Sequence, residues 1–172
     1  MSSSARLPQA ERLQFRRLTM DDLDPLAELY ADPDVMRYIG VGGVRTRDGT
    51  REKLRELIDA EASQGFGVWA TIEWETGTFI GRCGLMTWEI EGQHELEVLY
   101  LLGRPYWGRG LGTEAAIAIR DYAEQVLHKR RLIALIHGGN HASRRVAEKA
   151  GFRHEREVSF QGHHVAMFAR VC

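Results

Sequence analysis

A glycine-rich segment in the second half of the chain constrains the fold more than any other feature. The run Tyr106–Ala115 reads Y-W-G-R-G-L-G-T-E-A, and it lies between the apolar stretch Val98–Leu102 and an alanine-rich helical pattern. Closely spaced glycines let a strand turn sharply into a helix and let backbone N–H groups approach a ligand. The amides of the first helical turn and the helix dipole favour negative charge. The segment therefore predicts a strand–turn–helix unit whose turn binds a phosphate-bearing ligand.

The glycine spacing differs from two nucleotide-binding fingerprints. G-x-G-x-G is neither the G-x-G-x-x-G of dinucleotide-binding folds nor the G-x-x-x-x-G-K-[ST] of phosphate loops. A nucleotide-binding module is further disfavoured because the phosphate-binding lysine is missing after the glycines. A tight turn without any ligand explains two glycines equally well, so this segment alone leaves both interpretations open.

A second motif gives the glycines a context. The segment Asn140–Phe152 reads N-H-A-S-R-R-V-A-E-K-A-G-F. Together the two motifs resemble the acetyl-CoA-binding motifs of the GCN5-related N-acetyltransferase (GNAT) superfamily. Within that superfamily, their residues are similar to those of the Rim-type branch, which contains ribosomal-protein N-terminal acetyltransferases. The first part of the chain resembles the opening of that branch in order, through Glu11–Leu13, Arg16–Thr19, Asp21–Leu23 and Asp32–Met36.

The resemblance implies an α+β fold, the GNAT fold. Its mixed, mostly antiparallel sheet has about seven strands, one parallel pair that splays apart, and helices on both faces. Apolar periodicity in the sequence agrees with that order. It predicts strands at Leu13–Arg17, Phe66–Trp74, Phe79–Trp88, Glu95–Leu102, Leu132–Ile136 and His164–Val171, and helices at Asp21–Tyr30, Thr46–Ser63, Thr113–Leu127 and Asn140–Ala150, with a short helical turn from Asp32.

Length and composition limit the remaining possibilities. A chain of 172 residues suits one domain, which we expect over residues 11–172, after a disordered tail over residues 1–10. A formal net charge of −1 argues against direct nucleic-acid binding. Two cysteines, no signal-peptide pattern and no apolar run of membrane length predict a cytoplasmic protein without membrane contact. The sequence leaves open whether the chain forms a homodimer.

The resemblance implies acetyl-CoA as co-substrate and assigns its binding residues. Pantetheine would bond to the main chain of Tyr100, Leu101 and Leu102 like an added strand, and one N–H there would serve as oxyanion donor. Asn140 would cap the last helix and reach the cofactor arm. The pyrophosphate would bind the backbone amides of Gly108, Arg109, Gly110, Leu111, Gly112 and Thr113.

Side chains near the motifs allow two interpretations. The guanidinium groups of Arg109, Arg144 and Arg145 are either phosphate partners or a solvated surface. Trp107, where much of the superfamily has Gln or Arg, is interpreted as a packing residue rather than as a ligand contact.

The predicted catalytic residues are a hydroxyl and a carboxylate. Many superfamily members carry a tyrosine, as donor to the leaving thiolate, at the place of Ala147. Ser143 is one helical turn earlier on the same face, and it is the replacement donor or a helix-end residue bonded to backbone. Glu95 and Glu97 share one face of a strand. Glu97 matches the glutamate of the family wording E-x-G-Y and is predicted as the general base; the alternative is a surface salt bridge.

The histidines and cysteines give no competing site. None of the seven histidines has the spacing of H-E-x-x-H or an equivalent metal motif, so we expect no metal. Neither cysteine has an activating neighbour in sequence.

The predicted function is acetyl transfer to a primary amine, a protein N-terminus or a small molecule, by direct attack in a ternary complex. A groove formed by residues 32–43, Trp88 and residues 161–164 would hold the acceptor. The alternative is a non-catalytic acyl-CoA-binding or sensor domain.

Overall fold

The computed structural model describes residues 6–40 and 42–172, and its centre is one mixed β-sheet. The strands lie in the order β1-β2-β3-β4-β5-β7-β6, and every neighbouring pair is antiparallel except β4 and β5, which are parallel. This arrangement confirms the predicted α+β fold. The strand bounds are β1 Leu13–Arg17, β2 Val68–Glu73, β3 Phe79–Ile90, β4 Gln93–Leu102, β5 Arg131–His137, β6 Arg153–Phe160 and β7 His163–Val171.

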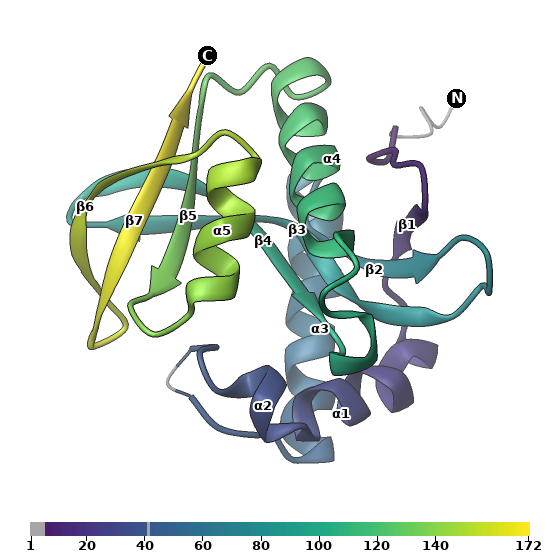
Figure 1. Ribbon diagram of the computed structural model, residues 1–172. Coiled ribbons are helices and arrows are strands. Elements are labelled where there is room, and N and C mark those ends of the chain that lie inside the picture. The colour runs from purple at the N-terminus through teal and green to yellow at the C-terminus, as the bar shows by residue number, and fades with distance from the viewer. Residues whose placement is uncertain (1–5, 41) are drawn as a thin grey trace.

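Helices cover both faces of this sheet, as predicted. In Figure 1, α4 and α5 lie in front of the sheet and α3 behind it, with α1 and α2 below. Two separate groups of buried side chains correspond to these layers, one under α4 and α5 and the other between α1, α3 and the sheet. The helix bounds are α1 Leu23–Ala31, α2 Pro33–Met36, α3 Arg47–Gln64, α4 Leu111–Gln125 and α5 His141–Lys149.

Side-chain caps set the helix starts. The Thr46 hydroxyl accepts from the Gly49 N–H at 3.1 Å, and α3 begins at the next residue. At the predicted helix start near Asp21, the chain first makes a 3₁₀ turn, Met20–Asp22, before α1. The Asp22 carboxylate accepts from the Thr19 N–H at 2.9 Å, so Thr19 caps the 3₁₀ turn and the α-helix begins after it.

Strand β6 and residues 6–10 are two regions where the structure differs from the sequence-based prediction. Strand β6 had no predicted range, because most of its side chains are exposed at the sheet edge and give little apolar periodicity. Within the expected tail, residues 1–5 lie outside the described part of the chain. Leu7 and Ala10 pack against the main core, and Gln9 forms a β-bridge with Gln14, so residues 6–10 belong to the fold.

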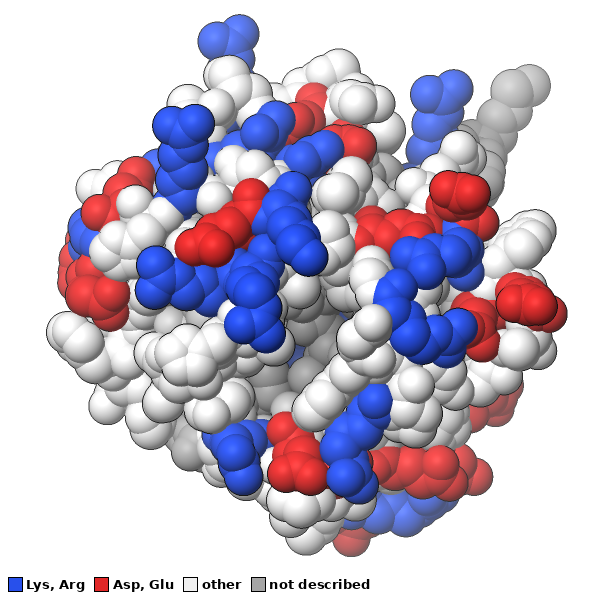
Figure 2. Space-filling view, in the orientation of Figure 1, with Lys and Arg blue, Asp and Glu red and all other residues white. Residues whose placement is uncertain are grey.

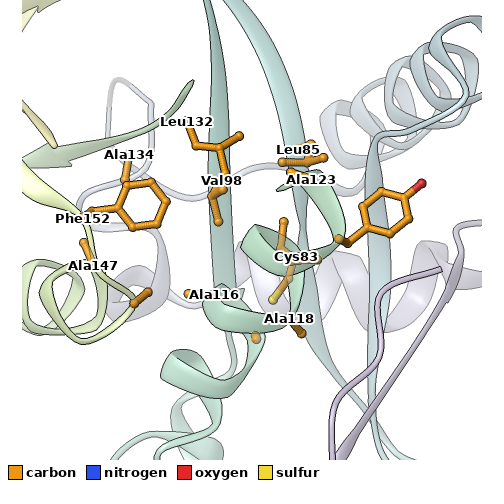
Figure 3. Close-up of a cluster of buried hydrophobic side chains, with 14 of the residues drawn as sticks. Cys83, Leu85, Val98, Ala116, Ala118, Ala123, Leu132, Ala134, Ala147 and Phe152 are labelled. Carbon is orange, nitrogen blue, oxygen red and sulfur yellow. The ribbon is translucent and has the colours of Figure 1, made fainter. Parts of the chain in front are cut away.

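Small side chains let α4 approach the sheet closely. Ala116, Ile119 and Ala123 are completely buried, as the predicted apolar face of this helix requires. Figure 3 shows Ala116 and Ala123 in one cluster with Val98 of β4 and Leu85 of β3. This packing fixes the start of α4, and with it the glycine turn, against the end of β4.

The parallel pair β4–β5 is short. Only Glu97 and Ile133 are in register between these strands, whereas the antiparallel ladder between β3 and β4 continues to Leu102. The two strands therefore diverge beyond Glu97, as the resemblance implied. Of the helices in the described residues, none has the length and apolarity needed to cross a membrane.

Candidate active site

A cleft of about 610 Å³ opens where β4 and β5 diverge. Figure 2 shows this hollow near the centre of the face, with Lys and Arg side chains along its rim over α5. The cleft is lined by the end of β4, the glycine turn, the start of α4, the end of β5 and one side of α5. The structure thus brings every predicted site residue to one cleft, with Arg109 as the exception.

The edge of β4 that faces the cleft offers main-chain hydrogen-bonding groups. The Gly103 N–H donates to the Ile80 carbonyl on β3 at 2.8 Å. Backbone groups alternate in direction along a strand, so Leu101 also faces β3, and Tyr100 and Leu102 face the cleft. Of the three residues predicted to bond pantetheine through the main chain, Leu101 does not fit, because its backbone groups belong to the sheet ladder.

The glycine turn places free amides at the cleft. Gly108 and Gly110 have φ of 72° and 77°, a left-handed conformation that favours glycine. Gly110 is the N-cap of α4, and its carbonyl accepts from the Glu114 N–H at 3.1 Å. The preceding N–H groups, of residues 111–113, have no partner within the helix. All three of these residues line the cleft. Gly112 is the one glycine among them, and its φ is not left-handed.

The arginines near the motifs divide into two groups. Arg109 points away from the cleft and pairs with Glu73 of β2 at 2.5 Å, so its guanidinium is not placed to meet a ligand in the cleft. Arg144 pairs with Glu148 at 3.1 Å and does not line the cleft. Arg145 and Lys149 of α5 do line it, and so does Arg37, which pairs with Asp34 at 3.8 Å.

Trp107 closes the turn onto the strand end. Its side chain is half exposed, which is more than the predicted packing role implies. The indole Nε1–H donates to the Leu102 carbonyl at 2.8 Å. This bond occupies one of the two lone pairs of the carbonyl oxygen, and the Leu102 N–H is the donor that this residue can offer to a ligand.

Two hydroxyl groups meet on the α5 side of the cleft. The Tyr100 hydroxyl lies 3.0 Å from Ser143 Oγ and 2.9 Å from the Ser143 carbonyl oxygen. Burial raises the pKa of Tyr100 well above its ordinary value, although the hydrogen bond to Ser143 opposes this. Asn140 caps α5 by accepting from the Ser143 N–H at 3.1 Å. Ala147 is buried in the core beside Phe152 (Figure 3).

The Tyr100 hydroxyl was missed by sequence reasoning, which assigned only the main chain of that residue. The signal was present in the alternation of β4. Tyr100 and Glu97 are an odd number of residues apart, so their side chains lie on opposite faces of the strand. Tyr100 therefore points toward α5, and Glu97 points toward the other face.

Glu97 is enclosed by protein at the point where the strands separate. Its Oε2 accepts from Trp88 Nε1 at 2.6 Å, and its Oε1 accepts from the Leu135 N–H at 3.3 Å. Burial raises its pKa to about 7, against the opposing effect of these hydrogen bonds and of Arg82. Glu95 instead pairs with Arg131 at 2.9 Å. Among the residues described, Glu97 has no such ion pair, so the salt-bridge alternative was wrong for Glu97.

A smaller pocket of about 180 Å³ adjoins the cleft on the Glu97 side. Glu97 and Leu99 line both spaces. All three regions expected to form the acceptor groove contribute, through Tyr38, Trp88 and Gln161 among others. Val41, within the first region, lies outside the described residues.

The described residues provide neither a metal site nor a reactive cysteine. In the described part of the chain, no group of three or more His, Cys, Asp or Glu side chains could hold a metal ion. Cys83 is fully buried under α4 (Figure 3). Burial raises the pKa of its thiol to about 11, which leaves little thiolate near neutral pH.

Comparison with known proteins identifies the family. The acetyltransferase (GNAT) domain family matches residues 12–153. The uncharacterized protein YkkB of Bacillus subtilis is 35% identical over 163 residues, covering 93% of this chain and 92% of its own. A GNAT-family acetyltransferase structure from Bacillus anthracis has a TM-score of 0.82 and 26% identity, covering 96% of this chain and 98% of its own.

A structure of the ribosomal-protein α-N-acetyltransferase RimL in complex with coenzyme A has the same fold. Its TM-score is 0.77 at 18% identity, over 95% of this chain and 96% of its own. Fold, cleft and family match agree, and the chain belongs to the GNAT family of acetyl-CoA-dependent N-acetyltransferases.

Proposed function

We propose that this N-acetyltransferase moves the acetyl group directly from acetyl-CoA to a primary amine while both substrates are bound. The observation that carries the proposal is the position of Glu97, which lines both the cleft and the smaller pocket. A base at this junction can accept the proton of an amine in the smaller pocket while the amine attacks a thioester in the cleft. A pKa of about 7 suits a base that works near neutral pH.

The cleft offers complementary groups along the length of acetyl-CoA. We assign the pantetheine arm to the main chain of Tyr100 and Leu102, and one N–H there to the developing oxyanion. The pyrophosphate is assigned to the amides of residues 108–113 at the start of α4. Arg145 and Lys149, which line the cleft, supply cationic partners for phosphate.

The leaving thiolate needs a proton as the C–S bond breaks and the C–N bond forms. We assign this donation to Ser143, whose Oγ lies 3.0 Å from the Tyr100 hydroxyl. The proton lost by Ser143 is replaced from solvent through the open cleft, and the Tyr100 hydroxyl holds Ser143 in place by its hydrogen bond. Ala147 was the reason to consider a non-catalytic acyl-CoA sensor. The hydroxyl pair removes that reason, because a donor is available from another position.

The acceptor class follows from the sequence resemblance only in part. The Rim-type wording of the motifs supports a protein N-terminus, and a small-molecule amine is the other candidate, since fold likeness does not determine a substrate. We assign the activity to residues 11–172 acting as one domain.

Incubation with radiolabelled acetyl-CoA and pooled peptides and small amines tests this function. We expect label to pass to an amine, and Glu97→Gln to reduce the rate by roughly 10- to 100-fold, at the low end of general-base contributions. The matched control is Glu89→Gln, which removes an exposed carboxylate of β3. Tight acetyl-CoA binding without transfer to any amine would instead support the sensor.

A further inference from the structure

The smaller pocket beside Glu97 carries more positive than negative charge. Its lining includes Arg45, Lys53 and Arg82, and among the described residues that line it Glu97 is the only carboxylate. Lys53 is paired with Glu56 at 3.1 Å, which leaves the two arginines as the cations to explain.

Arg82 is the more unusual of these two arginines. It lies on β3, is 8% exposed, and its Nε donates to the Tyr30 hydroxyl at 2.5 Å. The guanidinium carbon lies 5.4 Å from the centre of the Tyr30 ring, and that of Arg45 lies 5.9 Å from the same ring. Among the residues described, Arg82 has no carboxylate partner in an ion pair, unlike the part-buried Arg131.

Arg82 is near enough to Glu97 to lower the pKa of that carboxyl, although the two form no ion pair. A buried guanidinium gains stability when an anion pairs with it directly. Only Nε of Arg82 has a hydrogen-bond partner among the described residues, so its two terminal nitrogens are available to the pocket that it lines. A guanidinium fork matches the two oxygens of a carboxylate. A carboxylate that enters this pocket can therefore pair with the terminal nitrogens of Arg82.

The strand register places this anion site beside the proposed base. Arg82 is opposite Leu101 and Glu97 is opposite Met86 in the β3–β4 ladder. Residues 82 and 86 of β3 and residues 97 and 101 of β4 therefore share one face of the sheet. A molecule that places an amine near Glu97 can reach Arg82 along this face with a second group. A pocket of about 180 Å³ limits that molecule, or the part of it inside, to a few heavy atoms.

We propose, building on the acetyl transfer proposed above, that the acceptor is a primary amine that also carries a carboxylate, which Arg82 binds with support from Arg45. The same chemistry is present in a free amino carboxylic acid and in a peptide N-terminus followed by an acidic side chain. Polycationic amines are poor acceptors here, because their additional charges would meet both arginines.

Matched pairs of acceptors test the anion directly. The series runs from glycine through β-alanine and γ-aminobutyrate to longer homologues, each compared with its uncharged carboxamide. The peptide part of the test compares two otherwise identical peptides, one that begins with Ala-Asp and one that begins with Ala-Asn. We expect the carboxylate to raise kcat/KM by roughly 10- to 100-fold over the amide in at least one pair, as hydrogen bonds to a charged group imply. The pair that shows this distinguishes the free acid from the peptide.

Arg82→Gln should reduce this preference to about 1, mainly through KM. Using the ratio of two acceptors removes any effect of the substitution on Glu97, because both acceptors use the same base. Arg82→Lys should restore part of the preference, and Arg153→Gln, on the exposed edge strand β6, should retain all of it. The preference in the unmodified protein needs no variant, so it remains a test if Arg82→Gln fails to fold.

Three results would overturn the inference. Equal kcat/KM for every acid and its amide would mean that no anion is recognised, while the proposed acetyl transfer would stand. A preference that persists in Arg82→Gln would move the anion site elsewhere. Transfer to no amine of any charge would refute the proposed function and this inference together.

Discussion

Replacing Glu97 by glutamine should make the stability of the protein respond differently to pH. Burial raises the pKa of Glu97 from an ordinary value near 4.5 to about 7. The folded protein therefore holds this proton up to a higher pH than the unfolded chain does. The stabilisation is fully present below about pH 4.5, and it is lost as the pH rises through about 7.

The size of this effect follows from the two pKa values. Each pKa unit corresponds to about 1.4 kcal/mol, so the full change from 4.5 to about 7 gives about 3 to 4 kcal/mol. Glutamine resembles the protonated carboxyl in being neutral. Its single amide oxygen can accept from Trp88 or from Leu135 while its NH₂ group cannot accept, and this cost does not change with pH. The difference in unfolding free energy between the two proteins should therefore shift by about 3 kcal/mol from pH 4.5 to pH 8, in favour of glutamine at the higher pH.

Urea denaturation of both proteins at several pH values measures this difference. The comparison depends on the shift with pH and not on the absolute stabilities, so a constant cost of the substitution cancels. Glu89→Gln shows what removal of an exposed carboxylate does by itself. A difference that stays constant across this pH range would refute the argument, since Glu97 would then be ionised as easily in the folded protein as in water.

The remaining predictions concern the cleft. Gly112→Asp should abolish acetyl-CoA binding in a folded protein, because its carboxylate repels the pyrophosphate. Gly112→Ala should still bind acetyl-CoA, because a Cβ there meets only Val146 at 3.7 Å. Normal acetyl-CoA affinity of the Asp variant in calorimetry would refute the assignment of the pyrophosphate site. Arg145→Ala should weaken acetyl-CoA binding by roughly 1–3 kcal/mol and Arg109→Ala should not; equal affinities would mean that Arg145 is solvated surface. Ser143→Ala should lower kcat roughly 10- to 100-fold at neutral pH with little change in acetyl-CoA affinity; unchanged kcat would make Ser143 a helix-end residue.

Much of this fold could be predicted because its signals are local. The glycines before α4, the apolar spacing of α3 and the apolar strand β5 are local patterns, and the structure has all three elements. The exposed edge strand β6 carries no such pattern, and its place depends on pairing with β7.

The candidate site could be predicted where it depends on the backbone and less well where side chains choose partners. Residues of the glycine turn line the cleft as expected. The direction of Arg109 is decided by Glu73, which is 36 residues away in sequence. The contact between Tyr100 and Ser143 likewise joins β4 to α5. Such pairs depend on tertiary packing, so a local pattern such as the alternation of β4 can indicate the face on which Tyr100 lies but not its partner.

The central claim is direct transfer in a ternary complex, and initial velocities measured while both substrates are varied test it most directly. Direct attack predicts reciprocal plots that intersect, and a protein whose mass is unchanged after incubation with acetyl-CoA alone. The buried Cys83 agrees with this, because burial raises its pKa to about 11 and disfavours an acetyl-cysteine intermediate. Parallel plots, together with an acetylated protein formed before any amine is added, would contradict the account.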